Sequence, residues 1–131
     1  MTPGNLQTSA EAVRRQYLTA AVMTASPTKL VVLLYEGAIQ ALFRAEHALA
    51  TGNRLAAGPH LRKALSIVGE LRASLDLDQG GELAQTLFAL YGFATDRIIK
   101  GNVDLDPAPI GEAKAVLSKL KEGWDGIVRA G

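Results

Sequence analysis

The sequence contains no cysteine. This absence excludes a disulfide framework, a zinc site with thiolate ligands, an iron–sulfur cluster and a thiol nucleophile. A chain of 131 residues can bury about two-thirds of the surface that its unfolded form exposes, so it needs no covalent cross-link. We therefore expect one domain that folds in a reducing compartment.

Excess charge of one sign and long apolar runs are also missing. Fourteen basic and thirteen acidic residues give a net charge of +1, and the only basic doublets are Arg14-Arg15 and Arg62-Lys63. A nucleic-acid-binding stripe is not expected from so few clustered charges. No run approaches the ~18 apolar residues of a membrane-spanning helix, and the N-terminus lacks the pattern of a secretory signal. These features favour a cytoplasmic protein without membrane insertion.

Motifs for metals and phosphates fail on their spacing. Neither His47 nor His60 has a glutamate three residues earlier, as a di-iron bundle requires. The stretch 76–81 begins like a calcium loop, but Leu87 stands where the bidentate glutamate is needed. Gly80-Gly81 lacks the lysine and the serine or threonine of a phosphate loop. We predict no metal, no cofactor and no catalytic residue, and hence no enzyme.

Apolar residues recur at helical spacing over four long stretches, which are residues 27–50, 54–75, 81–100 and 107–128. Short polar connections separate them, and short connections make neighbouring helices antiparallel. The predicted fold is all-α, an antiparallel up-down four-helix bundle over residues 23–131. A thinner stripe at residues 10–20 is too short for a stable isolated helix. Residues 1–22 are therefore predicted to be a flexible segment with a short, mobile helix.

Prolines and small polar residues mark the predicted helix starts. Ser26 precedes Pro27, whose ring suits the first helical position, so Ser26 is the expected N-cap. Asp106 precedes Pro107 in the same arrangement. Gly52 can take the left-handed conformation that closes the first long helix. Both proline-led helices should therefore begin sharply.

Three other positions predict irregularities. Asn53 can cap the second long helix, but Pro59 lies several residues inside it, so either its first turn is irregular or it begins near Gly58. Gly92 costs about 1 kcal/mol against alanine in a helix, which indicates the close approach of another backbone. Gly101-Asn102 is the expected stop of the third helix.

The helix over residues 27–50 has apolar residues on more than one face. The residues that widen its stripe include Val31, Leu33, Tyr35, Ile39 and Phe43. Two interpretations stay open for each of them. They are buried in the core, or they line a long groove that accepts an amphipathic partner segment.

Several motifs, in the same order along the chain, resemble the flagellar secretion chaperone family FliS over about residues 14–126. The residues that carry the resemblance are Tyr17, Thr24-Ala25-Ser26-Pro27, Lys29-Leu30, Leu34-Tyr35-Glu36-Gly37-Ala38-Ile39, Lys63-Ala64, Glu70-Leu71-Arg72-Ala73-Ser74-Leu75-Asp76, Gly80-Gly81-Glu82-Leu83-Ala84, Leu90-Tyr91 and the stretch 117–124. Glu36 stands where the family more often has aspartate.

The resemblance implies a cytoplasmic, non-enzymatic bundle that binds the disordered C-terminal segment of flagellin. Such a chaperone prevents premature polymerisation and assists flagellar type III export, with a component of the export gate as a further partner. It also implies that the chain before the bundle covers part of the groove when flagellin is absent, with Tyr17 and Val22 as a removable plug.

The residues expected to contribute to partner binding or its gating are Tyr17, Val22, Ser26, Leu33, Tyr35 and Ile39. A protein of another class remains as the alternative. It is a structural or adaptor bundle that self-associates through the same apolar surface.

Overall fold

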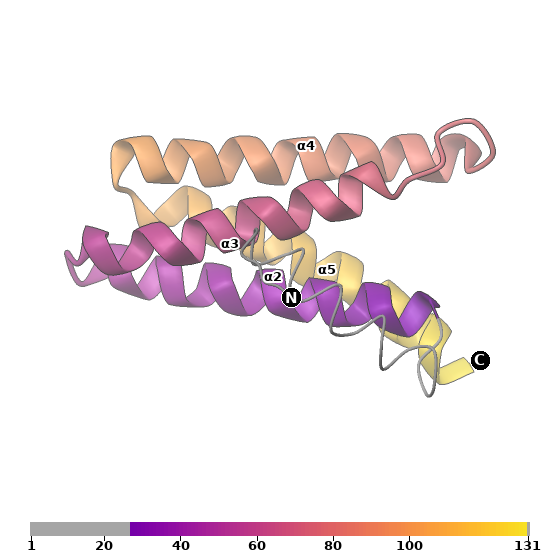
Figure 1. The fold of residues 1–131 in the computed structure, drawn as a ribbon, viewed down its shortest axis with the longest axis horizontal. Coiled ribbons are helices and arrows are strands. Elements are labelled where there is room, and N and C mark those ends of the chain that lie inside the picture. Colours follow the sequence, from indigo (N-terminus) through magenta and orange to yellow (C-terminus); the bar gives the residue numbers. More distant parts are fainter. Residues whose placement is uncertain (1–26, 131) are drawn as a thin grey trace, which may run out of the picture.

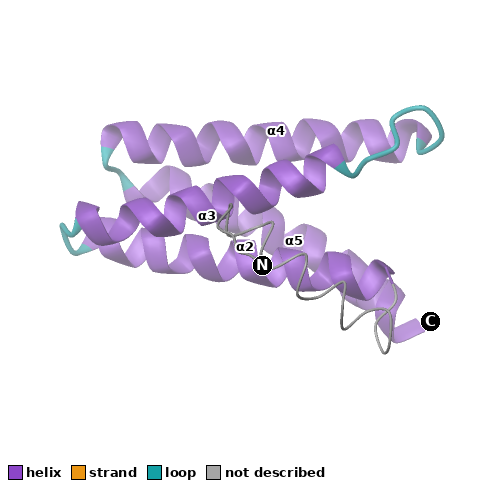
Figure 2. Ribbon diagram, viewed as in Figure 1, coloured by secondary structure: helices purple, strands orange, loops and turns teal. Residues whose placement is uncertain are grey.

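The computed structural model describes residues 27–130, with side chains placed as far as Ile127. It contains the helices α2 (Pro27–Ala50), α3 (Arg54–Ala73), α4 (Gly81–Asp104) and α5 (Pro107–Ala130). Only helices and short connections occur in this part of the chain (Figure 2). The predicted helix at 10–20, the predicted flexible segment 1–22 and the predicted cap Ser26 lie outside it.

The four helices form the predicted bundle. The chain reverses direction at every connection, so sequence neighbours are antiparallel (Figure 1). α2 packs against α3 and α5, and α4 packs against the same two helices. α2 and α4 therefore face each other diagonally across the core. The prediction of an antiparallel up-down four-helix bundle is confirmed.

The connection between α2 and α3 has the predicted chemistry. Gly52 has a φ of 77°, the left-handed conformation expected at the end of α2. The Asn53 side chain accepts a hydrogen bond of 3.2 Å from the Ala56 amide, which caps α3. α2 ends at Ala50, as predicted.

α3 begins at Arg54, so the alternative start near Gly58 is wrong. Pro59 lies inside the helix and cannot donate to the carbonyl of Leu55 four residues earlier. Leu55 is 88 % exposed, so water can reach that part of the first turn. The helix ends at Ala73, two residues before the predicted position.

The predicted stop of α4 at Gly101-Asn102 is wrong, because the helix continues to Asp104. Leu105 then takes a left-handed conformation with a φ of 53°, and the Asp106 amide donates to the Gly101 carbonyl at 2.9 Å. Gly101 is buried where α5 crosses, and a Cβ atom there would lie 2.5 Å from Ile110 Cδ1. The glycine therefore permits close helix packing and does not end the helix.

The expectation that another backbone approaches Gly92 closely was also wrong. A Cβ atom there would lie 3.4 Å from the Arg72 guanidinium, and no backbone of another helix comes as near. The neighbour is thus a flexible side chain from α3, which also covers the ring of Phe88 at 4.1 Å.

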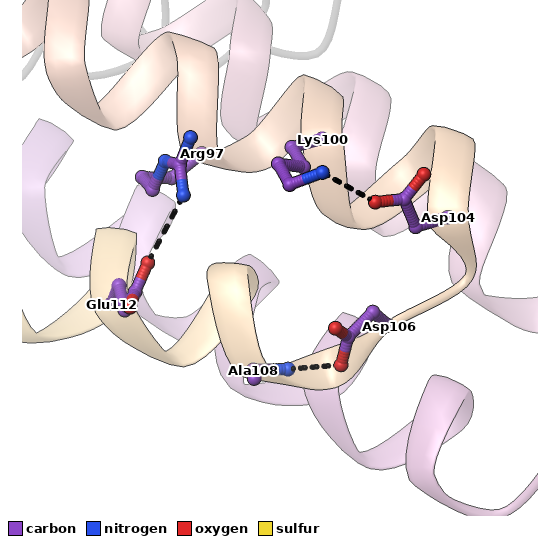
Figure 3. Close-up of polar contacts among 6 residues, drawn as sticks. All are labelled: Arg97, Lys100, Asp104, Asp106, Ala108 and Glu112. Carbon is purple, nitrogen blue, oxygen red and sulfur yellow. Dashed lines mark hydrogen bonds and ion pairs between the residues drawn. The ribbon is translucent and has the colours of Figure 1, made fainter.

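Polar contacts secure the turn between α4 and α5 (Figure 3). Asp106 Oδ1 accepts from the Ala108 amide at 3.0 Å, which confirms the predicted cap of α5. Lys100 pairs with Asp104 at 2.7 Å within α4, and Arg97 reaches Glu112 on α5 at 3.5 Å. Of these contacts, only the pair of Arg97 and Glu112 joins α4 to α5.

Candidate partner-binding groove

A groove with a volume of about 580 Å³ lies between α2 and α5. Its lining residues are Glu36, Ile39, Gln40, Phe43, Lys114, Ser118, Lys121, Glu122 and Asp125. A second hollow of about 460 Å³ shares Phe43 and is also lined by Glu46, His47, Ala50, Pro107 and Ala108. We call the two together the α2–α5 groove, with an Asp125 end and a Pro107 end.

Small residues on the inner faces let the two helices approach while larger side chains remain at the groove. On α2, Ala38, Ala41 and Ala45 are buried against the bundle. On α5, Gly111 leaves room for Glu46, whose Oε2 would lie 2.7 Å from a Cβ atom at that position. Ile39 and Phe43 therefore stay at the edge of the core and do not enter it.

The apolar floor of the groove consists mainly of Ile39 and Phe43. Ile39 is partly buried and packs against the core, whereas Phe43 is 59 % exposed. The Lys114 ammonium lies 5.2 Å from the centre of the Phe43 ring, within the range of a cation–π contact. An exposed aromatic ring beside a charged group is a suitable anchor point for a partner helix.

Charged side chains line both walls. Lys121 lies 2.8 Å from Asp125 and 3.7 Å from Glu36, and it joins the two helices. The hydrogen bond to Asp125 is the main cause of the raised pKa of Lys121. Lys114 makes a contact of 2.5 Å with Glu46 across the groove. Both lysines thus hold acids from the opposite helix at the rim.

The predicted site residues are not gathered in one place. Ile39 lines the α2–α5 groove, and Leu33 is partly buried on α2 without lining any of the hollows described here. Tyr35 is fully buried in the core. Tyr17, Val22 and Ser26 lie outside the described residues.

Tyr35 has a structural environment that its sequence position did not reveal. Its hydroxyl shares a hydrogen bond of 2.5 Å with the Tyr91 hydroxyl of α4 and accepts one of 3.2 Å from Trp124 Nε1 of α5. Burial raises the pKa of Tyr35 above the ordinary tyrosine value, and it raises the pKa of Tyr91 well above that value. These three residues connect α2, α4 and α5 through hydrogen bonds between their side chains.

The sequence interpretation missed the polar half of the groove. Lys114, Ser118, Lys121 and Asp125 recur at spacings of four, three and four residues, so they lie on one face of α5. This face is adjacent to the buried stripe of Ile110, Ala113 and Leu117. A stripe of charged and polar residues next to a buried apolar stripe could have indicated, from the sequence, that this face of α5 borders a groove.

A separate apolar surface lies at the other side of α5. Two smaller hollows of about 270 and 210 Å³ share Leu83, Leu87 and Trp124. Leu83 is 68 % exposed, and Ile127 is 54 % exposed. Val31, one turn into α2, also lines the larger of the two. The surface therefore adjoins the end of the bundle at which α2 begins.

The helices described here include none long and apolar enough to cross a membrane. Within residues 27–127, no group of three or more histidines and acidic residues is arranged to hold a metal ion.

Comparisons with known proteins identify similar chains. A family model described as flagellar protein FliS matches residues 9–131. The flagellar secretion chaperone FliS of Salmonella typhimurium is 39 % identical over 109 residues, covering 82 % of this chain and 81 % of the relative. The flagellar secretion chaperone FliSB of Pseudomonas aeruginosa is 37 % identical over 108 residues, covering 82 % and 86 %. A crystal structure of a bacterial flagellar chaperone superposes with a TM-score of 0.74 at 26 % identity, covering 92 % of this chain and 98 % of the other.

Proposed function

Because this chain belongs to the FliS family of flagellar secretion chaperones, we propose that its α2–α5 groove binds the disordered C-terminal segment of flagellin. The single observation that carries the choice of site is the open apolar floor of Ile39 and Phe43 between two charged walls. The bound segment is kept from polymerising in the cytoplasm and is delivered to the flagellar type III export machinery. A component of the export gate is the second partner.

The groove has the dimensions of a short partner helix. Its lining residues on α2 run from Glu36 to Ala50, which corresponds to about 21 Å along the axis at ~1.5 Å per residue. A disordered segment loses conformational entropy when it becomes helical. Burial of its apolar face along the whole groove offsets that cost, as in other helix-in-groove complexes.

Residues 1–22 form a removable cover in this proposal, with Tyr17 and Val22 as the side chains that compete with the partner. Ser26 marks the boundary between the cover and α2. The chain enters α2 at Pro27, beside the apolar surface of Val31, Leu83 and Trp124. Leu33 and Tyr35 contribute through the packing of α2, and Ile39 contributes through direct contact.

The test is calorimetry with a synthetic C-terminal segment of flagellin. We expect binding at micromolar concentration or tighter, with a negative heat-capacity change because apolar surface is buried. Absence of binding at these concentrations would overturn the proposal. Sedimentation of the free protein tests the alternative: a tight dimer whose association the peptide leaves unchanged would favour a self-associating adaptor bundle.

The cover is tested by a variant that lacks residues 1–22. We expect tighter binding of the flagellin segment and an unchanged cooperative unfolding transition, since the deletion leaves every described helix intact. Loss of the cooperative transition would show that these residues belong to the core. Unchanged affinity with an intact bundle would remove Tyr17 and Val22 from the binding mechanism.

A further inference from the structure

The α2–α5 groove differs in charge from the chain as a whole. Its lining includes the four carboxylates of Glu36, Glu46, Glu122 and Asp125 but only the two ammonium groups of Lys114 and Lys121. The whole chain has a net charge of +1. The groove is therefore acidic on a weakly basic protein.

The excess of negative charge is concentrated at the Asp125 end. In the middle of the groove, Lys114 and Glu46 neutralise each other at 2.5 Å. At the Asp125 end, Lys121 alone balances the carboxylates of both Glu36 and Asp125. At the Pro107 end the lining contains Glu46 and His47 and no further carboxylate.

Glu122 adds a third carboxylate at the Asp125 end. It pairs with the Lys119 ammonium at 4.0 Å, and the side chains of Glu122 and Lys119 are 72 % and 83 % exposed. Water screens an exposed pair at this separation, so it contributes little. The Glu122 carboxylate is thus available to a group that approaches from the groove.

These charges specify the chemistry of the occupant. We propose, on the basis of the function assigned above to this groove, that the bound segment is an amphipathic helix with lysine or arginine beside its apolar stripe. The apolar stripe lies on Ile39 and Phe43, and the basic side chains lie against Glu36, Glu122 and Asp125. An acidic helix meets like charges there. Charge complementarity of this kind selects among partners that have similar apolar faces.

Two synthetic peptides test the proposal. Both have about 18 residues, a length of ~27 Å as a helix, and the same leucine stripe. One has lysines beside the stripe at both ends, and the other has glutamates there. Placing the charges at both ends makes the result independent of the direction in which the peptide lies. In ~50 mM salt we expect about tenfold tighter binding of the lysine peptide, a preference that shrinks as added salt screens it.

Matched protein variants locate the charge that matters. Glu122→Lys should abolish or reverse the preference for the lysine peptide. Asp96→Lys makes the same change of charge at an exposed position of α4, diagonally opposite α2, and should leave the preference unchanged. Both positions are exposed, so both variants should keep the unfolding transition of the parent.

Equal affinity for the two peptides would overturn the inference, as would an equal loss of preference in Glu122→Lys and Asp96→Lys. It is also overturned if the flagellin segment binds the protein and neither synthetic peptide does. If the flagellin segment fails to bind and the lysine preference holds, the charge selectivity stands and the proposed function falls.

Discussion

The hydroxyl oxygens of Tyr35 on α2 and Tyr91 on α4 lie 2.5 Å apart, although the residues are 56 positions apart in the sequence. The two side chains reach across the diagonal of the bundle, and Trp124 Nε1 donates to the Tyr35 hydroxyl from α5. The Tyr35 hydroxyl therefore has two hydrogen-bond partners, whereas among the described residues the Tyr91 hydroxyl has only that of Tyr35.

The two tyrosines should respond unequally to removal of the hydroxyl. Tyr35→Phe leaves both the Tyr91 hydroxyl and the Trp124 N–H without their hydrogen-bond partner, so we expect the free energy of unfolding to fall by about 2 kcal/mol. Tyr91→Phe leaves the Trp124 bond in place and should cost about 1 kcal/mol. Urea unfolding of both variants measures the difference. Equal losses would show that the Trp124 bond contributes nothing to stability.

Alkaline pH should destabilise the bundle through the same pair. Burial raises the pKa of Tyr35 and Tyr91 in the folded state, whereas the unfolded chain releases these protons near pH 10. Below that pH both states bind the protons and stability does not change. Above it the folded state binds more protons, so the free energy of unfolding falls as the pH rises, by at most about 1.4 kcal/mol per pH unit for each proton of difference.

Urea unfolding at a series of pH values between about 8 and 11 measures this effect. Tyr91→Phe should reduce the slope above pH 10, since it removes one of the two buried hydroxyls. Lys121, whose pKa is also raised, acts in the same direction but remains in the variant. A slope that is the same in the parent and in Tyr91→Phe would contradict the assignment to the tyrosines.

The periodicity of the apolar residues was sufficient to predict the bundle. α2 has the predicted bounds, and the starts of α3, α4 and α5 follow from Asn53, the break at Gly80-Gly81 and Asp106-Pro107. Local chemistry decides these ends, so the sequence shows them directly. The same reasoning failed at Gly101. A glycine is needed there because Ile110 of α5 packs against it, and the local sequence of α4 does not show that contact.

The groove could be predicted only in part, because the core residues and the groove residues of α2 are both apolar and the sequence does not distinguish them. Ile39 and Tyr35 were both predicted to be core or groove residues; Ile39 lines the hollow between α2 and α5, whereas Tyr35 is fully buried. Which apolar side chain remains exposed depends on the distance between α2 and α5. That distance depends on the residues of α5 that face α2, and the sequence of α2 alone does not show it.

Gly101 should tolerate no side chain. In Gly101→Ala the new Cβ would lie 2.5 Å from Ile110 Cδ1 and 2.9 Å from the Asp106 carbonyl oxygen. Since the carbonyl belongs to the backbone, we expect a loss of about 1–3 kcal/mol, as for other overpacked sites. Gly69→Ala is the matched control, because no atom lies within 4 Å of a Cβ there; it should gain about 0.5–1 kcal/mol. Thermal unfolding of both variants checks the opposite signs.

Leu105 is strained at the end of α4, where its φ is 53°. A left-handed conformation costs an ordinary residue about 1 kcal/mol and glycine almost nothing. Leu105→Gly should therefore raise the free energy of unfolding by up to about 1 kcal/mol, measured by urea unfolding. A decrease would show that packing of the half-exposed leucine side chain outweighs the strain.

The apolar floor of the groove should be needed for binding and not for folding. We expect Phe43→Asp to weaken binding of the flagellin segment at least tenfold, because it removes an exposed ring and adds a fifth carboxylate to the groove lining. Leu55→Asp makes the same kind of change at an exposed position of α3 outside the groove. Calorimetry should detect no loss for this control. A loss of equal size in both variants would place the binding surface elsewhere.

The two walls of the groove come from the first and the last of the described helices. Trp124 and Tyr35, which join these walls near the Asp125 end, are 89 positions apart in the sequence. While a ribosome is still adding α5, α2 has only one of its two neighbours and the groove has only one wall. Contacts between distant parts of a chain form late, since the closing loop must be ordered first. The α2–α5 groove therefore exists only once α5 has packed against α2, and a chain that ends before α5 lacks it.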